Sequence, residues 1–148
     1  MPSQFEVETK GYAPPLQAWI DWILSGHDAE GLHAQLDDNV TFMSPVVFTP
    51  QKGAYITFAY LMAASEALGG NAGVFKYVRI FDCGQRAVLE FETEINGKYV
   101  NGVDMIEWSD EGKIVDFKVM VRPLQAVQAV HASMGAVLQK MQSAAKEG

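Results

Sequence analysis

The segment Gly97-Lys-Tyr-Val-Asn-Gly-Val-Asp-Met-Ile-Glu-Trp108 decides the fold, because it has the pattern of a long strand with one carboxylate, Asp104, among apolar residues. Successive side chains of a strand point to opposite faces, so one face carries Val100, Gly102, Asp104, Ile106 and Trp108. Both faces are largely apolar, and we expect both to be covered. An unpaired carboxylate is costly to ionise in such surroundings, so Asp104 must meet a donor or stay protonated. Asp104 is therefore the first candidate for a functional side chain.

Length and composition indicate one globular domain with a single core. The chain has 148 residues, of which 49% are hydrophobic and 20% are charged. The formal net charge of -7 disfavours contact with a phosphate backbone or an anionic membrane surface. We therefore expect neither a nucleic-acid partner nor a membrane partner.

Cysteine content and the first residues favour a cytoplasmic location. Cys83 is the only cysteine, so no disulfide can form within the chain. The N-terminal sequence Met-Pro-Ser-Gln-Phe-Glu lacks the basic and apolar regions of a signal peptide. No apolar run approaches the roughly 18 residues of a membrane span.

Helical periodicity begins after residues 1–13, which we expect to form a flexible lead-in to a single domain at 14–143. Pro14 and Pro15 begin a helix whose apolar stripe is Leu16, Trp19, Ile20, Ile23 and Leu24. Asp28 can cap a short second helix. Its expected inward side is Ala29, Leu32, His33 and Leu36.

The rest of the chain predicts a short strand, a buried helix, a four-stranded meander and a final helix. The short strand runs from Val40 to Ser44 and the helix from Ala54 to Leu68. Alternation at period 2 covers 74–82, 86–95, 99–109 and 113–121, with Asn96-Gly97 as a hairpin turn. The last helix begins at Pro123. This order predicts an α+β fold with helices on one face of a curved antiparallel sheet.

Four local features occur in an order that is found in one superfamily. They are Ser25-Gly26-His27-Asp28, Phe42-Met43-Ser44-Pro45, Gly53 before the third helix, and Val100 to Trp108 around Asp104. Between residues 16 and 121 the chain thus resembles the nuclear transport factor 2-like superfamily, which includes ketosteroid isomerases, scytalone dehydratase and the SnoaL-like polyketide cyclases. The resemblance implies a cone-shaped curved sheet with helices on its concave side, a small-molecule cavity and no cofactor.

The resemblance to ketosteroid isomerases is incomplete at the positions that carry their chemistry. Asp104 falls where those enzymes keep a protonated aspartic acid that stabilises the substrate oxyanion. Ser44 stands in the place of their general-base aspartate, and Ile20 and Leu61 stand in the places of two tyrosines. A serine without a base cannot take a proton from carbon near pH 7, and isoleucine donates no hydrogen bond. Steroid isomerisation by that mechanism is therefore not expected.

The resemblance and the strand and helix faces indicate one cavity lining: Ile20, Leu24, Phe42, Ser44, Tyr60, Leu89, Phe91, Asp104, Phe117 and Val119. A mostly apolar wall with a few polar groups is typical of a small-molecule site. Asp104 is the expected donor or acid, with a purely structural acid as the alternative. We nominate His33 as its catalytic partner, with a structural histidine as the alternative.

Other polar residues are expected to have lesser roles. His27, which precedes a helix cap, and His131, in the last helix, are interpreted as structural. Ser44 lacks the sequence context of a nucleophile and is interpreted as a ligand-binding hydroxyl. Three scattered histidines and one cysteine show no metal-binding spacing, so no metal site is expected.

The outward side of the sheet predicts a homodimer. Tyr99, Val103 and Met105 would form an exposed apolar patch on a monomer, and such patches usually mark interfaces. Two functions remain open. The chain either binds a small hydrophobic, carbonyl-bearing cyclic molecule and isomerises, dehydrates or cyclises it, or it is a non-catalytic ligand-sensing or dimerisation module.

Overall fold

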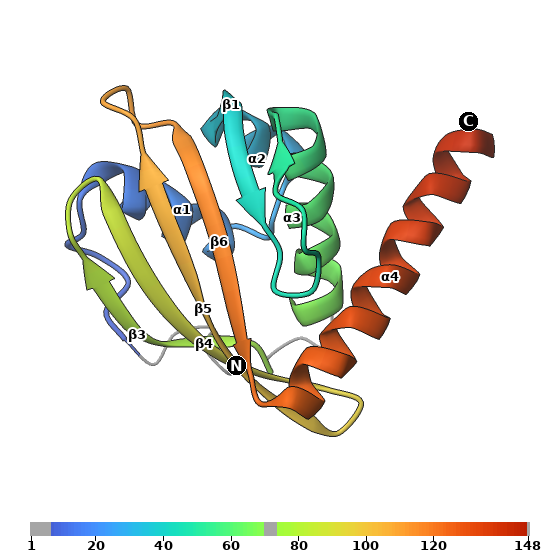
Figure 1. Ribbon diagram of the computed structural model, residues 1–148. Helices are drawn as coiled ribbons and strands as arrows, with labels where there is room; N and C mark the ends of the chain where they lie inside the picture. The colour runs from blue at the N-terminus through green and yellow to red at the C-terminus, as the bar shows by residue number, and fades with distance from the viewer. Residues whose placement is uncertain (1–6, 70–73, 148) are drawn as a thin grey trace.

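The computed structural model describes residues 7–69 and 74–147, which form an α+β fold (Figure 1). The helices are α1 (Pro14–Leu24), α2 (Ala29–Gln35), α3 (Ala54–Gly69) and α4 (Leu124–Glu147). The strands are β1 (Leu36–Met43), β2 (Gln51–Lys52), β3 (Lys76–Asp82), β4 (Arg86–Ile95), β5 (Lys98–Trp108) and β6 (Ile114–Arg122). The predicted order of helices, short strand, helix, meander and helix is confirmed.

The strands form one curved, unclosed sheet in the order β2-β1-β6-β5-β4-β3. The meander β3 to β6 is antiparallel, as predicted. Its central hairpin turns at Asn96 and Gly97, which both have positive φ, at 51° and 79°. One pair differs from the prediction, because β1 joins β6 in parallel. A parallel pair needs a long connection, and here α3 and three strands of the meander lie between its members.

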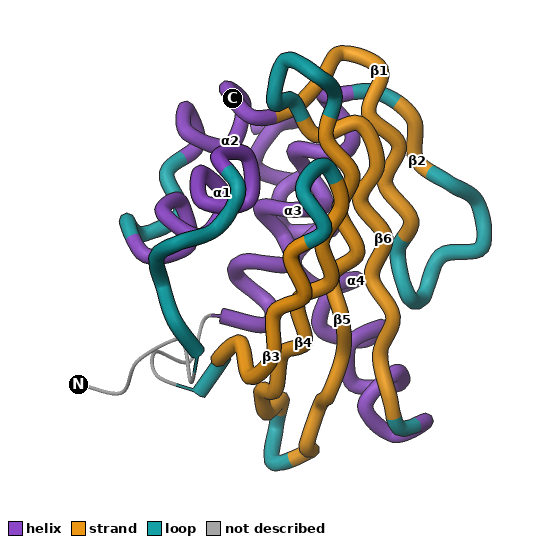
Figure 2. The backbone as a smooth tube through the Cα atoms, turned by 90° about the vertical axis from the view of Figure 1, so that its left-hand side faces the viewer, coloured by secondary structure: helices purple, strands orange, loops and turns teal. Residues whose placement is uncertain are grey.

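The helices α1, α2 and α3 cover one face of the sheet, as Figure 2 shows in side view, and α4 packs on the same face through the buried Val130 and Met134. The covered face of β5 carries Val100, Gly102, Asp104, Ile106 and Trp108, all buried, so the predicted phase of this strand is confirmed. Within residues 7–69 and 74–147, no helix or strand covers the other face. Tyr99 is 50% exposed and Met105 is 36% exposed.

The interior of α1 also follows the predicted stripe, except at its end. Leu16 and Ile20 are fully buried, whereas Leu24 is 46% exposed because it is the last residue of the helix. The predicted inward side of α2 is wrong at Ala29 and His33, which are exposed. This helix has only seven residues, and of these residues Leu32 alone has a buried side chain.

The predicted lead-in at 1–13 and the predicted end of the domain at 143 are described in part. Residues 1–6 of the lead-in fall outside the described residues. The described part is tied to the body, because the Ala13 N–H donates to Asp82 Oδ2 over 2.8 Å and Gln17 Nε2 donates to the Thr9 carbonyl over 2.8 Å. At the other end, α4 continues past residue 143 to Glu147.

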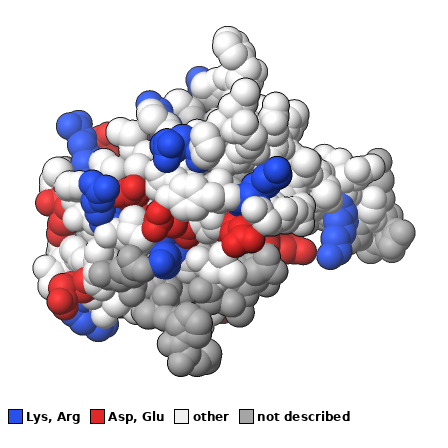
Figure 3. Space-filling view, turned by 90° about the horizontal axis from the view of Figure 1, so that it is seen from below, with Lys and Arg blue, Asp and Glu red and all other residues white. Residues whose placement is uncertain are grey.

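Figure 3 shows acidic and basic side chains interspersed over the face seen from below. Within residues 7–69 and 74–147, every helix is too short or too polar to span a lipid bilayer.

Candidate functional site

A cavity lies between the helices α1, α3 and α4 and the covered face of the sheet. The part of the cavity that the centre of a water-sized sphere can reach has a volume of about 80 Å³. By the same measure, one bound water needs roughly 10–15 Å³. The cavity therefore has room for one small organic molecule. It is lined by Trp19, Trp22, Ile23, His27, Phe42, Ser44, Pro45, Leu61, Ala64, Ser65, Leu68, Phe75, Tyr77, Phe91, Asp104, Phe117, Val119, Val121, Val130 and Met134.

Asp104 contributes a carboxyl group to the wall of this cavity. It is held in the middle of the sheet, paired with Leu89 on β4 and Val119 on β6, and is only 8% exposed. Burial raises the pKa of Asp104 from 3.8 to about 7, although the hydrogen bond from Tyr77 lowers it in part. The neutral and the ionised form of this carboxyl group therefore coexist near pH 7.

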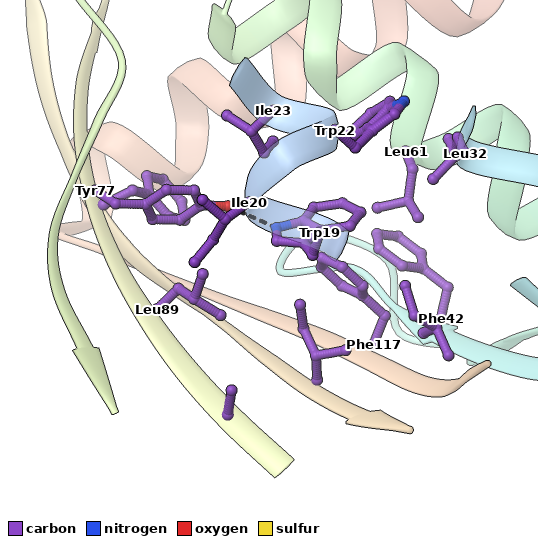
Figure 4. Close-up of a cluster of buried hydrophobic side chains, with 14 of the residues drawn as sticks. Trp19, Ile20, Trp22, Ile23, Leu32, Phe42, Leu61, Tyr77, Leu89 and Phe117 are labelled. Atoms are coloured by element: carbon purple, nitrogen blue, oxygen red, sulfur yellow. Dashed lines mark hydrogen bonds between the residues drawn. The ribbon is translucent and has the colours of Figure 1, made fainter. Parts of the chain in front are cut away.

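Tyr77 on β3 orients this carboxyl group. Its Oη donates to Asp104 Oδ2 over 2.6 Å and accepts from Trp19 Nε1 over 3.3 Å. Figure 4 shows the Tyr77 hydroxyl facing the Trp19 indole nitrogen. Burial, and then the neighbouring Asp104, raise the pKa of Tyr77 well above its ordinary value. Tyr77 thus stays protonated, and Asp104 lies at the end of a chain of hydrogen bonds that begins on α1.

Aromatic rings form much of the remaining wall. Phe117 meets the Trp19 ring edge-on at 5.2 Å between centroids and lies 5.9 Å from Phe42. Phe75 and Phe91 stack at 5.2 Å. These rings keep water from the carboxyl group, which is the physical cause of its raised pKa.

A second polar group lies on the helical side of the cavity. His27 follows Gly26 and has a φ of 66°, in the left-handed region that few residues other than glycine adopt. Its ring stacks on Trp22 at 5.0 Å, and its Nδ1 lies 2.6 Å from Ser65 Oγ on α3. Its Nε2 is buried and has no hydrogen-bond partner within the described part of the chain. Burial lowers the pKa of His27, opposed in part by the Ile23 carbonyl, so the ring is neutral near pH 7.

The structure brings together only part of the predicted site. Of the residues named from the sequence, those that face this cavity are Phe42, Ser44, Phe91, Asp104, Phe117 and Val119. Ile20 and Leu89 do not line it; both are fully buried in the core, where Ile20 comes from α1 and Leu89 from β4 (Figure 4). Leu24 is largely exposed, and Tyr60 lies behind Phe42 with ring centroids 5.4 Å apart.

His33, the nominated partner of Asp104, lies outside the cavity. It is exposed and stacks on Phe58, with ring centroids 3.8 Å apart. The short helix α2 turns this side chain toward the surface, so the structure does not place it beside Asp104.

Sequence reasoning missed Trp19, Trp22, His27, Ser65 and Tyr77 as site residues. Trp19 belonged to the predicted stripe of α1, and the segment Ser25-Gly26-His27-Asp28 served only as a feature of the superfamily, with His27 interpreted as structural. The sequence pattern did not indicate Tyr77, because the face of β3 on which this residue lies depends on an irregularity in the strand pairing. Within the described residues, no group of three or more His, Cys, Asp or Glu side chains is placed to hold a metal ion.

Comparisons with known proteins address the fold. No protein-family model matches the chain, and no curated protein matches it in sequence. Solved structures do match. A steroid delta-isomerase from Pseudomonas aeruginosa is 32% identical with a TM-score of 0.78, and the match covers 87% of this chain and 92% of that protein.

Two further structures agree. An uncharacterized bacterial protein with a cystatin-like fold from Silicibacter pomeroyi is 28% identical with a TM-score of 0.76, over 88% of this chain and 89% of that one. An NTF2-like protein of unknown function from Cytophaga hutchinsonii is 19% identical with a TM-score of 0.54, over 77% and 95%, and supports the fold alone. The helical layer, the curved sheet and the identity to the Pseudomonas protein lead to one conclusion: the chain belongs to the nuclear transport factor 2-like superfamily.

Proposed function

We propose that this protein binds a small apolar molecule with a carbonyl oxygen, and that the neutral carboxyl group of Asp104 donates a hydrogen bond to that oxygen. The observation that carries the proposal is Asp104 itself, buried on the wall of a mainly apolar cavity with its pKa raised to about 7. The Tyr77 hydroxyl donates a hydrogen bond to one oxygen of this carboxyl group, which fixes the orientation of the group. The similarity to a steroid delta-isomerase supports an apolar ring as the body of the ligand.

Such a donor stabilises negative charge that develops on a carbonyl oxygen. One well-placed donor in a water-poor site contributes about 3 to 4 kcal/mol to transition-state stabilisation. The reactions that such a donor accelerates pass through an enolate or a related oxyanion. Isomerisation, dehydration and cyclisation of carbonyl-bearing cyclic molecules belong to this group.

The alternative is a ligand-sensing module without catalysis. It is favoured by the residues that replace the catalytic groups of ketosteroid isomerases. Ile20 is fully buried in the core, and Leu61 lines the cavity without a donor. Ser44 uses its Oγ to accept the Val46 N–H over 3.1 Å.

Binding of β-tetralone, a bicyclic ketone whose only polar atom is the carbonyl oxygen, tests the proposal. Calorimetry at about pH 6, where Asp104 is mostly neutral, should show binding to the wild-type protein. Asp104→Ala should weaken it by about tenfold or more, as expected for the loss of one buried hydrogen bond. The matched control is Asp116→Ala, on the outward face of the neighbouring strand β6, which should bind normally. Equal affinity in wild type and Asp104→Ala would sink the proposal.

Hydrogen exchange distinguishes the enzyme from the sensor. In deuterated water the hydrogens beside the carbonyl of β-tetralone are replaced through its enolate, and NMR follows the loss of their signals. A catalytic cavity should accelerate this replacement, and Asp104→Ala should remove the acceleration. Binding without acceleration favours the sensor.

A further inference from the structure

The cavity has polar groups on two opposite walls. Asp104 and Tyr77 come from β5 and β3 in the sheet, whereas Ser65 comes from α3 and His27 from the turn after α1. The first pair is the basis of the proposed function. The second pair belongs to the same cavity but has no part in that function.

Both members of the second pair keep unused hydrogen-bonding capacity. A neutral imidazole has one N–H and one lone pair. If Ser65 donates to Nδ1, its oxygen keeps lone pairs that accept from a ligand hydroxyl; if Nδ1–H donates to Ser65, the hydroxyl hydrogen is free for a ligand oxygen. In either tautomer Ser65 can bind an oxygen function.

The surroundings of His27 are costly for a purely structural residue. Its backbone is in the left-handed region, and its Nε2 is buried without a hydrogen bond in the described part of the chain. The cap of α2 does not need it, because Asp28 already accepts the Gly31 N–H over 2.8 Å. A strained residue with an unused buried nitrogen on a cavity wall is typical of a binding site.

We propose that His27 and Ser65 form a second binding site for an oxygen of the ligand, with Ser65 in contact with it and His27 positioning the serine hydroxyl. The proposal rests on the proposed function, because it assumes that the cavity is occupied. It narrows the ligand class to apolar, ring-sized molecules with two oxygen functions: a carbonyl held by Asp104 from the sheet side, and a hydroxyl or second carbonyl held by Ser65 from the helical side.

The test compares β-tetralone with hydroxytetralones that carry one added hydroxyl at each successive position of the aromatic ring. At least one of these isomers should bind wild-type protein about tenfold more tightly than β-tetralone, which is the effect of one good neutral hydrogen bond. Ser65→Ala should abolish this gain, so that in the variant the preferred hydroxytetralone binds no more tightly than β-tetralone. Alanine is the best helix former, so this variant should fold.

A matched control is Ser44→Ala, which removes a hydroxyl of the same cavity that accepts the Val46 N–H. It should keep the gain. His27→Phe retains an aromatic ring beside Trp22 but has no ring nitrogen, and should reduce the gain, measured as the ratio of the two affinities within the same variant. In wild-type protein, the nitrogen resonances of His27 should shift with the preferred hydroxytetralone and not with β-tetralone.

The outcomes separate the two proposals. If β-tetralone binds through Asp104 but no added hydroxyl improves affinity, or if the gain persists in Ser65→Ala, the second site is wrong and the proposed function stands. If neither β-tetralone nor any hydroxytetralone binds, both are wrong.

Discussion

Asp104 makes the stability of this protein depend on pH in an unusual direction. Its pKa is about 7 in the folded chain and 3.8 ordinarily. Between these values the unfolded chain has lost the proton and the folded chain has kept it, so the free energy of unfolding falls as pH rises through this window. Each pKa unit corresponds to about 1.4 kcal/mol, and the whole effect is roughly 4 kcal/mol.

Comparison of wild type with Asp104→Asn isolates this contribution, because asparagine does not ionise. Urea unfolding at about pH 4 and about pH 8 should show the wild type losing stability relative to the variant. Asp116→Asn is the control. Burial also raises the pKa of Asp116, but this residue is partly exposed, so its variant should show a smaller change. A pH dependence that Asp104→Asn leaves intact would contradict the raised pKa.

The same carboxyl group should make ketone binding depend on pH. A carbonyl oxygen only accepts hydrogen bonds, so it loses its partner when Asp104 ionises. Affinity for β-tetralone should fall by about tenfold between pH 6 and pH 8, following the neutral fraction of a group with a pKa near 7. Asp104→Asn retains an N–H donor, and its calorimetric affinity should stay flat over this range. Tighter binding at pH 8 than at pH 6 in the wild type would mean that the carboxylate, and not the acid, holds the ligand.

At the scale of elements, the position of Asp104 could be predicted and that of its partner could not. The Asn96-Gly97 turn fixes the register of β4 and β5 and so places Asp104 opposite Leu89. The inward orientation of Tyr77 depends on an irregularity in the pairing between Tyr77 and Arg79, where the register of β3 against β4 shifts by one residue. Without it, Tyr77 would lie opposite Glu92, on the outward face. One inserted residue reverses the face of a strand, and nothing in the sequence of β3 marks it.

The two histidines show the same limit for helices. Periodicity placed His33 inside, but it assumes a helix long enough to present a full stripe, and α2 is short. His27 enters the cavity because the chain turns back through the left-handed conformations of Gly26 and His27 after α1. Helical periodicity predicts side-chain directions only within a helix, so it cannot predict the direction of His27 in the turn after α1.

Two glycines should respond in opposite directions to alanine. A methyl group on Gly102 of β5 would lie 2.5 Å from the Met120 carbonyl oxygen and 2.5 Å from Phe91 Cζ. Gly102→Ala should therefore cost about 1 to 3 kcal/mol and displace Phe91 from the cavity wall. Gly135 lies inside α4 with open space around it, so Gly135→Ala should stabilise the protein by up to about 1 kcal/mol. Urea denaturation measures both, and a neutral Gly102→Ala would show that β5 yields at this point.

At the scale of the whole molecule, the uncovered face of the sheet is the main apolar surface still to be explained. Tyr99 and Met120 are each 50% exposed, Met105 is 36% exposed, and Val103 lies directly opposite Met120. We propose that two chains pack through these faces about a twofold axis, since neighbouring exposed apolar side chains often mark an interface.

Sedimentation at micromolar concentration should show a dimer, and Met105→Glu should convert it to a monomer by placing charge in the contact. Tyr55→Glu is the control. Tyr55 is 85% exposed but lies on α3 in the helical layer, so this variant should remain dimeric. A wild-type monomer, or a dimer that survives Met105→Glu, would exclude this interface.

The tryptophans give the molecule an internal optical reporter. Trp19 and Trp22 both line the cavity, with ring centroids 5.0 Å apart, while the third tryptophan, Trp108, is buried in the core away from the cavity lining. A ketone that enters must come to rest against two of the three indoles and quench their emission. Fluorescence titration would thus follow occupancy directly, without any label or coupled assay.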